Sequence, residues 1–202
     1  MLDKQKTNAS FIGFAGNIGV GKTTFTKLLS KNLQWTPYFE SVTDNPYLND
    51  FYNDMERWGF NLQIYFLHKR FQMHQKMSRS SIGVIQDRTI YEDKEIFARN
   101  LYQLEKLSSR DWDNYCGLFS VMTSYLKKPD LIIYLRAETD TLLSRIKSRG
   151  RDYEISIDPD YVQTLNLSYD RWIQSIADET VMTIQTDNFN IFEDTGKFEE
   201  IK

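Results

Sequence analysis

The sequence has few of the residues that build disulfides, metal centres and membrane spans. It contains one cysteine, Cys116, so no disulfide can form within the chain. Its two histidines, His68 and His74, lack the spacing of a metal-binding pair, and we expect them on a helix surface and Cys116 in the interior. Residues 1–8 are polar and no apolar run approaches about 18 residues. We therefore expect a cytoplasmic protein without a signal peptide or a membrane span.

Positive charge is not in excess either. The 25 Lys and Arg residues are outnumbered by 28 Asp and Glu, which gives a formal net charge of −3. The chain lacks the overall basic field that holds a nucleic-acid backbone, so we expect any basic cluster to serve a small anion. With 202 residues, of which 41% are hydrophobic, the chain can form a sizeable core, and we expect a single domain over residues 1–202.

The most informative stretch is residues 16–23, GNIGVGKT, which fits the pattern Gly, four residues, Gly, Lys, Ser/Thr of a phosphate-binding loop. The apolar residues 11–15 before it predict a buried strand, and residues 24–33 after it have helical periodicity. Such a loop presents backbone amides and a helix N-terminus to phosphate oxygens, while Lys22 reaches the β- and γ-phosphates and Thr23 ligates Mg²⁺. The alternative is a glycine-rich turn without a ligand, which motif and context disfavour. The predicted phosphate-binding residues here are Gly16, Asn17, Ile18, Gly19, Val20, Gly21, Lys22, Thr23 and Thr24.

Two further predicted strands end on charged residues. Residues 35–40 predict a strand that ends on Glu40, and residues 82–86 predict one followed by Asp87, Arg88 and Thr89. Because ligands bind at the carboxyl ends of parallel strands, Glu40 is placed where chemistry occurs, although a solvated loop glutamate is the commoner case. An acidic residue such as Asp87 can serve as the second metal-coordinating group, and Arg88 can bridge donor and acceptor oxygens.

The remaining pattern predicts an α/β fold, a five-stranded parallel sheet flanked by helices. The other expected strands are 131–135 and 181–185, and the other expected helices are 47–55, 60–77, 90–106, 111–127, 138–149 and 158–178. Ser109 or Asp111 is expected near a helix cap. Gln63 and Arg70 share one helix face, as a solvated edge or as the hydrogen-bonding wall of a pocket, and residue statistics favour the edge.

Arg145, Arg149 and Arg151 are crowded around Gly150. Their charges would repel one another unless they shared an anion, and a guanidinium matches the geometry of phosphate. Given the phosphate loop, this pattern favours a mobile arginine lid over a triphosphate, and a plain basic surface patch is the alternative.

These landmarks together resemble the deoxynucleoside kinase family, over nearly the whole chain from about Phe11 to Phe192. The resemblance implies that Glu40 accepts the proton of the substrate 5′-hydroxyl, that Arg88 contacts the 5′-oxygen and that Asp87 serves the metal. It also implies the following groups: Gln63, Arg70 and Asp93 as base readers, Tyr52 and Glu154 at the sugar 3′-hydroxyl, Phe97 beside sugar and base, and Arg145, Arg149 and Arg151 in a lid at about residues 149–157. We also place Asp187, in the loop expected at 186–192, among the ATP-binding residues.

The sequence departs from the family pattern at two positions. Asp87 stands where many relatives have Glu, and we expect the shorter side chain to reach the metal through a water. Tyr153 stands where some lids carry a second acidic residue, which leaves open how the lid is anchored.

The resemblance implies ATP as phosphate donor, Mg²⁺ as cofactor and a deoxynucleoside as acceptor. We expect feedback inhibition by a deoxynucleoside triphosphate, and a homodimer that packs through helices 90–127 and 60–77, but no nucleic-acid or membrane partner. Because Gln63 both donates and accepts while Arg70 and Asp93 add a donor and an acceptor, the site should reject thymidine. Relatives that favour thymidine lack this Arg and Asp pair, so the resemblance implies purine or cytosine substrates. A bacterial-looking composition favours deoxyadenosine among these, with deoxyguanosine and deoxycytidine as weaker substrates. A nucleoside monophosphate kinase such as thymidylate kinase is the alternative. A switch GTPase is less favoured because the chain has no Asn-Lys-x-Asp motif.

Overall fold

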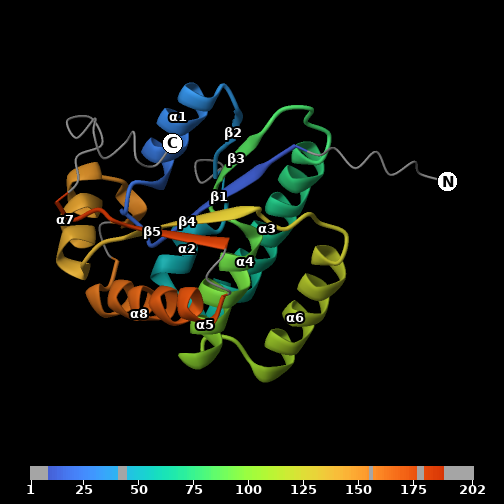
Figure 1. Ribbon diagram of the computed structural model, residues 1–202. Helices are drawn as coiled ribbons and strands as arrows, with labels where there is room; N and C mark the ends of the chain where they lie inside the picture. The colour runs from blue at the N-terminus through green and yellow to red at the C-terminus, as the bar shows by residue number, and fades with distance from the viewer. Residues whose placement is uncertain (1–8, 41–44, 155–156, 177–179, 189–202) are drawn as a thin grey trace.

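The computed structural model describes residues 9–40, 45–154, 157–176 and 180–188 (Figure 1). Its centre is a sheet of five strands in the order β2-β3-β1-β4-β5, and every neighbouring pair is parallel. The strands are β1 (Phe11–Ala15), β2 (Thr36–Tyr38), β3 (Val84–Asp87), β4 (Leu131–Arg136) and β5 (Val181–Gln185). The α/β fold and the parallel sheet predicted from the sequence are confirmed.

The strand order fixes where the ligand site opens. The chain winds from β1 to one side of the sheet to form β2 and β3, and then to the other side to form β4 and β5. Phe14 of β1 is in register with Asp87 of β3 and with Ile133 of β4. The loop that leaves β1 therefore lies between the carboxyl ends of β3 and β4, at the switch point where open α/β sheets bind their ligands.

One hydrophobic core joins the sheet to α1 (Lys22–Leu33), α7 (Thr139–Arg149) and α8 (Pro159–Ser175). Phe14, Ile85 and Ile133 of the strands are fully buried in it. The helices contribute Phe25, Leu29, Leu142, Ile146, Val162, Leu165 and Tyr169. Figure 1 shows α7 and α8 together on one side of the molecule. This core holds the start of α1, and with it the phosphate loop, against the sheet.

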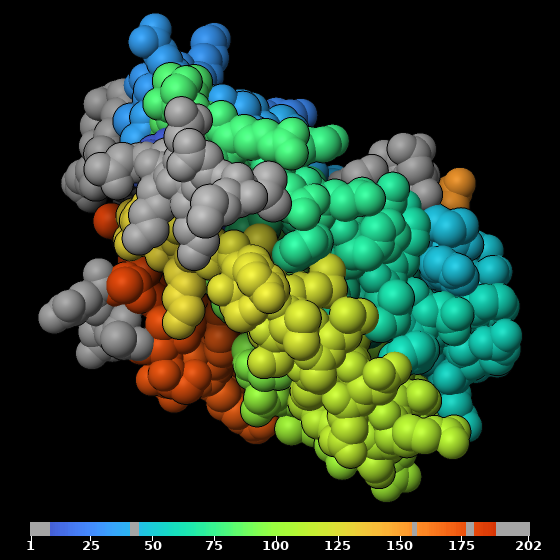
Figure 2. Space-filling view, turned by 90° about the vertical axis from the view of Figure 1, so that its right-hand side faces the viewer, coloured from blue at the N-terminus to red at the C-terminus, as the bar shows by residue number. Residues whose placement is uncertain are grey.

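A second core lies among helices, away from the sheet. It joins α2 (Leu48–Asn53), α3 (Met55–Met77), α5 (Arg99–Gln103) and α6 (Ser109–Thr123). Its buried members include Phe51, Leu67, Leu101 and Tyr115. Figure 2 shows α3 and α6 side by side on the face that they form. This helical layer supplies the wall of the site opposite the phosphate loop.

The helix boundaries around α3 differ from the predicted ones. The helix expected at 47–55 is only α2, because the backbone leaves helical geometry at Asp54, with φ −150°. The side chain of Asp54 then accepts a hydrogen bond from the amide of Arg57, and α3 begins at Met55 instead of residue 60. An N-cap therefore decides the boundary between two apolar helical patterns.

The helix expected at 90–106 consists of three parts: α4 (Ile90–Glu92), a π-helical turn at Asp93–Ala98 labelled η1, and α5. A π-helical turn shifts the side chains after it relative to an α-helix, and such turns often occur at functional sites. The next helix, α6, is capped by Ser108, whose hydroxyl accepts from the amide of Asp111 at 3.1 Å, so Ser109 and Asp111 both lie near the cap as predicted.

Four further expectations are corrected. His74 is buried at 4% exposure, whereas His68 is exposed as predicted, and Cys116 is only partly buried. The predicted strand 35–40 is β2, which ends at Tyr38, so Glu40 lies in the loop that follows it. Strand β3 runs one residue past the predicted end and includes Asp87. None of the described helices is long and apolar enough to cross a membrane.

Candidate active site

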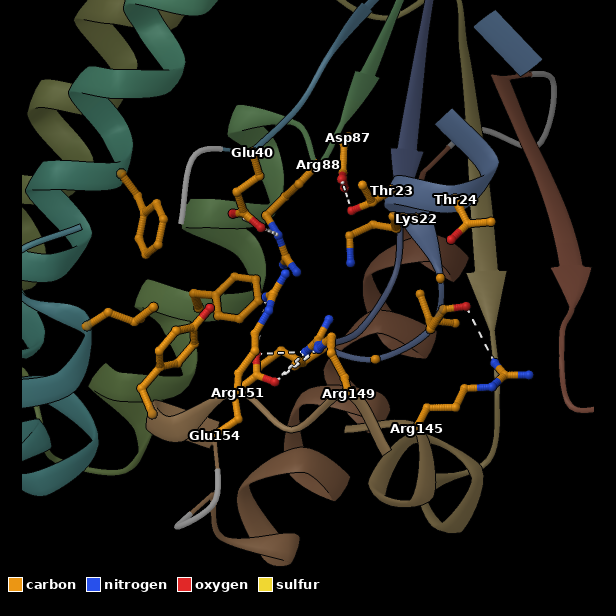
Figure 3. Close-up of a pocket in the computed structure, with 18 of the residues that line it drawn as sticks. Lys22, Thr23, Thr24, Glu40, Asp87, Arg88, Arg145, Arg149, Arg151 and Glu154 are labelled. Atoms are coloured by element: carbon orange, nitrogen blue, oxygen red, sulfur yellow. Dashed lines mark hydrogen bonds and ion pairs between the residues drawn. The ribbon is translucent and has the colours of Figure 1, made fainter. Parts of the chain in front are cut away.

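A pocket of about 870 Å³ opens at the carboxyl ends of the strands, with the phosphate loop at one end and side chains of α2 and α3 at the other (Figure 3). All predicted site residues lie in the described part of the chain, and all but three line this pocket. The three exceptions are Gly16, Asn17 and Arg70. The volume is in the range of small-molecule sites, and one continuous cavity joins the predicted phosphate and base regions.

The phosphate loop has the backbone that its glycines allow. Gly16 and Gly21 have φ values of 145° and 106°, and a Cβ on Gly16 would lie 2.5 Å from the backbone oxygen of Leu135. Lys22 is buried, and its Nζ donates to the carbonyl oxygens of Gly16 at 2.8 Å and Asn17 at 3.0 Å. Burial, together with the charge of Arg88, lowers the pKa of Lys22 to about 8. The lysine is therefore held inside the loop at the place where phosphate oxygens would lie.

The side chain of Asn17 holds the phosphate loop to α8. Its side chain points away from the pocket: Nδ2 donates to the carbonyl oxygen of Val162 at 2.9 Å, and Oδ1 accepts from the amide of Ile18. Nδ2 also lies 3.3 Å from Oδ1 of Asn166 in α8. The Asn17 side chain thus ties the loop to α8, and only its backbone remains to meet a phosphate.

Asp87 and Thr23, the two predicted metal ligands, are in direct contact. The Thr23 hydroxyl donates to Oδ2 of Asp87 at 2.6 Å (Figure 3). Among the described residues there is no cluster of three or more side chains with metal-ligand chemistry. One carboxylate and one hydroxyl beside a phosphate loop nevertheless fit Mg²⁺, which binds proteins through one or two oxygen groups and takes its other ligands from phosphates and water.

Arg88 and Glu40 form the centre of the pocket. Arg88 Nε lies 3.2 Å from Oε1 of Glu40, and its guanidinium stacks over the ring of Phe97 at 4.4 Å. Glu40 is also ion-paired with Arg70. Burial alone would raise the pKa of Glu40, but Arg88, Arg70 and Lys22 lower it to about 2. The carboxylate therefore stays ionised at neutral pH and points into the cavity between two guanidinium groups.

The base end contains the buried residues Gln63, Arg70 and Asp93, so the solvated edge favoured by residue statistics is wrong for Gln63 and Arg70. Gln63 lines the pocket, and its Oε1 has no hydrogen-bond partner among the residues that the structure describes. Arg70 lies behind the pocket wall, where its Nε donates to Asp93 at 2.6 Å and its Nη1 donates to the carbonyl of Arg88 at 3.0 Å. Burial raises the pKa of Asp93 to about 6 against the opposing charge of Arg70.

The arginines of the predicted lid do not form a single group. Nη2 of Arg149 contacts both carboxylate oxygens of Glu154, at 2.6 and 2.7 Å. Nη1 of Arg151 lies 3.4 Å from the same carboxylate. Arg145 points away from them and donates to the hydroxyl of Thr186 after β5 at 3.0 Å. The pattern predicted that the arginines share an anion. Glu154 is such an anion for Arg149 and Arg151 but not for Arg145.

The lid segment is anchored by an aromatic contact. Tyr153 lies in the short 3₁₀ helix η2 (Asp152–Glu154), and its ring stacks on Tyr52 of α2 with the planes 10° apart. This contact ties Tyr153, in the segment predicted to form the lid, to α2. The remaining expected lid residues 155 and 156 lie outside the described residues.

Asp187 lines the pocket and accepts hydrogen bonds at the N-terminus of α7. Its Oδ1 accepts from the amide of Glu138 at 2.9 Å and from the hydroxyl of Thr141 at 2.7 Å. These hydrogen bonds lower the pKa of Asp187 although burial acts against them. They fix the loop after β5 relative to α7. Residues 189–192 of the loop expected there lie outside the described residues.

Sequence reasoning missed two buried residues beside this site, Glu92 and Tyr169. Glu92 completes a capping box with Thr89, a Thr-x-x-Glu pattern that is visible in the sequence. Tyr169 lies in α8, and its hydroxyl contacts both Glu92 and Arg88. No local pattern marks Tyr169, because its partners are 77 and 81 residues away.

The fold and the site together define a class of enzyme. A parallel sheet whose central strand leads into a Gly-x-x-x-x-Gly-Lys-Thr loop, with an Asp at the end of the neighbouring strand in contact with the loop threonine, is the arrangement of the P-loop phosphotransferases. An arginine and a carboxylate project into the same pocket beside the phosphate loop. This arrangement places the chain among kinases of small acceptors.

Comparison with known proteins narrows the class. The family model for deoxynucleoside kinase matches residues 12–202. The chain is 39% identical to the deoxyadenosine/deoxycytidine kinase of Bacillus subtilis (strain 168), over 95% of this chain and 89% of that protein. It is 42% identical to the deoxyadenosine kinase of Dictyostelium discoideum, over 87% and 71% of the two chains. The chain belongs to the deoxynucleoside kinase family.

The solved structures agree with this assignment. The structure of deoxyadenosine kinase from M. mycoides with bound dATP is 30% identical and covers 95% of this chain and 98% of that one, with a TM-score of 0.83. The same enzyme with the products dCMP and dCDP has a TM-score of 0.84. The resemblance inferred from sequence motifs is therefore confirmed at the level of family and fold.

Proposed function

We propose that this protein transfers the γ-phosphoryl group of ATP to the 5′-hydroxyl of a purine deoxynucleoside, with deoxyadenosine as the preferred substrate. The observation that carries the proposal is one continuous pocket that is lined by Lys22 at one end and by Gln63 at the other, with Glu40 and Arg88 between them. Relatives named deoxyadenosine kinase, at 42% and 30% identity, support the choice of purine.

In this mechanism the γ-phosphate lies on the loop, and the 5′-oxygen lies between Glu40 and Arg88. Glu40 accepts the hydroxyl proton as the oxygen attacks, while Lys22 and the arginines of the lid stabilise the charge on the transferred group. Arg88 faces both Glu40 and the phosphate loop, so it can contact the attacking oxygen. Thr23 and Asp87 would hold Mg²⁺, which would neutralise charge on the β- and γ-phosphate oxygens when bound. Residues 1–202 act as one domain, with residues 149–157 as its lid.

The base end supports a substrate with an exocyclic amine. Gln63 offers an unpartnered oxygen, and the carboxylate of Asp93 reaches the pocket while Arg70 holds it from behind. Adenine, guanine and cytosine each present an amino group to such acceptors, whereas thymine presents a carbonyl and a methyl group. Tyr52 and Glu154 line the middle of the pocket, where we place the sugar 3′-hydroxyl, with Phe97 beside the ring.

The same pocket fits feedback inhibition by the end product. A deoxynucleoside triphosphate can place its base at Gln63 and its phosphates at Lys22 within one cavity. The M. mycoides enzyme has been solved with bound dATP and with bound dCTP. We expect inhibition by dATP that is competitive with ATP, and uncompetitive inhibition would contradict this placement.

A homodimer is the proposed assembly. The outer face of α6 exposes Leu118, Val121 and, just past the helix, Tyr125, which is 81% exposed. Figure 2 shows α6 beside α3 on one face of the molecule, and exposed apolar patches often mark protein–protein contacts. Light scattering at micromolar concentration that gives a monomeric mass would contradict this assembly.

A substrate panel tests the proposed activity. The protein is incubated with Mg²⁺-ATP and each of deoxyadenosine, deoxyguanosine, deoxycytidine, thymidine, dAMP and dTMP, and the products are separated by chromatography. We expect deoxyadenosine to be phosphorylated with the highest kcat/KM and thymidine to be a poor substrate. Phosphorylation of the monophosphates alone would assign the protein to the nucleoside monophosphate kinases. Equal use of thymidine and deoxyadenosine would overturn the assignment of the base-reading residues.

A further inference from the structure

Glu92 is a fully buried carboxylate that joins three segments around the site without lining the pocket. Its Oε1 accepts from the amide of Thr89 at 2.7 Å and from the Thr89 hydroxyl at 3.2 Å. Its Oε2 accepts from the Tyr169 hydroxyl at 2.7 Å and from the amide of Gly16, the first glycine of the phosphate loop, at 3.3 Å. One carboxylate thus links the strand-end motif, α8 and the phosphate loop.

Tyr169 extends this link to Arg88. The Tyr169 hydroxyl accepts from Nη1 of Arg88 at 2.8 Å, whereas Nη1 is 4.0 Å from Glu92. Tyr169 is fully buried, and burial raises its pKa well above the ordinary value for tyrosine. The phenol therefore stays protonated. Its hydroxyl donates a hydrogen bond to Glu92 and accepts one from Arg88.

Arg88 needs such support because its backbone is strained. Its φ is 68°, in the left-handed region that residues with a side chain rarely adopt. Conformations of this kind persist only where surrounding contacts hold them, and they cluster at functional sites. Here the Arg88 amide donates to Phe14 and its carbonyl accepts from Arg70, while Glu92 holds the amide of the next residue.

We propose that Glu92 and Tyr169 are positioning residues that set the guanidinium of Arg88 and the first amide of the phosphate loop in one fixed geometry. Arg88 is then held between two carboxylates: Glu40 directly, and Glu92 through the Tyr169 hydroxyl. Neither positioning residue lines the pocket: Tyr169 acts through Arg88, which does, and Glu92 acts through the first amide of the phosphate loop. The inference rests on the proposed phosphotransfer to a deoxynucleoside, in which Arg88 contacts the attacking oxygen.

Tyr169→Phe removes the hydroxyl and keeps the ring. Because a hydrogen bond to a charged group is lost from a residue used in the transition state, we expect kcat to fall about 10- to 100-fold, with the KM values for ATP and deoxyadenosine changed less than about threefold. The matched control is Tyr134→Phe. Tyr134 is also buried and its hydroxyl also contacts a carboxylate, Asp170 at 2.9 Å, but it has no hydrogen bond to Arg88. The control is expected to retain the wild-type kcat.

A double-mutant cycle separates positioning from general stability. If Tyr169 acts through Arg88, Tyr169→Phe adds less than about a twofold loss of single-turnover rate in an Arg88→Lys background. A role confined to packing would multiply the two losses. A Tyr169→Phe enzyme with wild-type kcat, or losses that multiply in the cycle, overturns the proposal for the Arg88 branch.

Glu92→Gln tests the phosphate-loop branch and does not depend on catalysis. The amide keeps the shape of the side chain but has one acceptor oxygen instead of two, so in either orientation its NH₂ group faces the backbone amide of Thr89 or of Gly16. We therefore expect ATP to bind at least about fivefold more weakly by calorimetry. Unchanged ATP affinity in a folded Glu92→Gln protein overturns this branch. If wild-type protein phosphorylates no deoxynucleoside, the proposed function fails, and the calorimetric result still decides whether Glu92 positions the loop.

Discussion

The ion pair between Glu154 and Arg149 predicts that one substitution changes the two ligands in opposite directions. Glu154 is ion-paired with the Arg149 guanidinium, which is proposed to bind phosphate. The same carboxylate is proposed to accept from the 3′-hydroxyl of the sugar. Glu154→Gln removes the charge that competes with phosphate and weakens the acceptor for the sugar, so we expect tighter binding of ATP and weaker binding of the deoxynucleoside.

The size of the effect follows from the geometry. The contacts of 2.6 and 2.7 Å are those of a charge-assisted pair, which contributes about 1.5–3 kcal/mol when buried. Glu154 is 5% exposed and Arg149 is 34% exposed, so we discount the pair for solvent screening to about 1–2 kcal/mol. A ligand that no longer has to break this pair gains up to that amount, which corresponds to about a 5- to 30-fold increase in ATP affinity.

Two measurements on Glu154→Gln test this reasoning. Calorimetry gives the affinity for ATP, and steady-state kinetics give kcat/KM for deoxyadenosine, which we expect to fall about tenfold or more. With 2′,3′-dideoxyadenosine, which has no 3′-hydroxyl, Glu154→Gln and the wild-type protein should have the same kcat/KM. The control is Glu138→Gln, which removes an exposed carboxylate that is ion-paired with Arg136. Weaker ATP binding, or an equal loss with both nucleosides, would refute the reasoning.

Further predictions concern the ionisable groups. Glu40→Gln should lower kcat by about 10²- to 10⁴-fold with ATP affinity unchanged, and near-normal turnover would remove Glu40 from the role of base. Lys22→Ala should abolish most phosphotransfer by losing stabilisation of the transferred group, and normal product formation would contradict the loop assignment. Because the pKa of Asp93 is raised to about 6, kcat/KM for deoxyadenosine should fall as the pH drops through about 6, and Asp93→Asn should lack this pH dependence; an identical profile in both proteins would exclude Asp93. Burial lowers the pKa of His74 from 6.5 to about 4, so the unfolded chain takes up the proton at a higher pH than the folded protein does. The free energy of unfolding should therefore decrease as the pH falls from about 6.5 to about 4, by up to about 3 kcal/mol. Urea unfolding of His74→Leu should show a smaller decrease over the same pH range.

Much of the fold could be predicted because its signals are local. The apolar strands, the glycine-rich loop and the charged residues at strand ends each occupy a few neighbouring positions, and the parallel arrangement follows from alternating strands and helices. The order of motifs then identified the family. The ends of α2 and α3 were missed because a single cap, Asp54, decides them, and the π-helical turn was missed because a period of 3.6 residues does not reveal it.

The contacts within the site could not be predicted in the same way, because they join distant segments. Spacing put Gln63 and Arg70 on one face of α3, but only the packing of α4, η1 and α6 makes that face interior. The sequence grouped Arg145 with the lid arginines, yet its partner, Thr186, is supplied by the chain after β5. Tyr169 carries no motif at all, and its importance appears only when α8 is packed beside Glu92.

Arg70 imposes a constraint on how this enzyme can change its substrate range. One guanidinium contacts Asp93, a proposed base reader, Glu40, the proposed proton acceptor, and the carbonyl of the strained Arg88. Under these proposed roles, a mutation of Arg70 that admits a different base also releases Glu40, so it changes base selectivity and turnover together. Variants selected for a new nucleoside should therefore change first at Gln63, whose side-chain oxygen has no hydrogen-bond partner in the described part of the chain. Changes at Arg70 should follow only after compensating substitutions around Glu40. Sequencing the variants from successive rounds of selection tests this order.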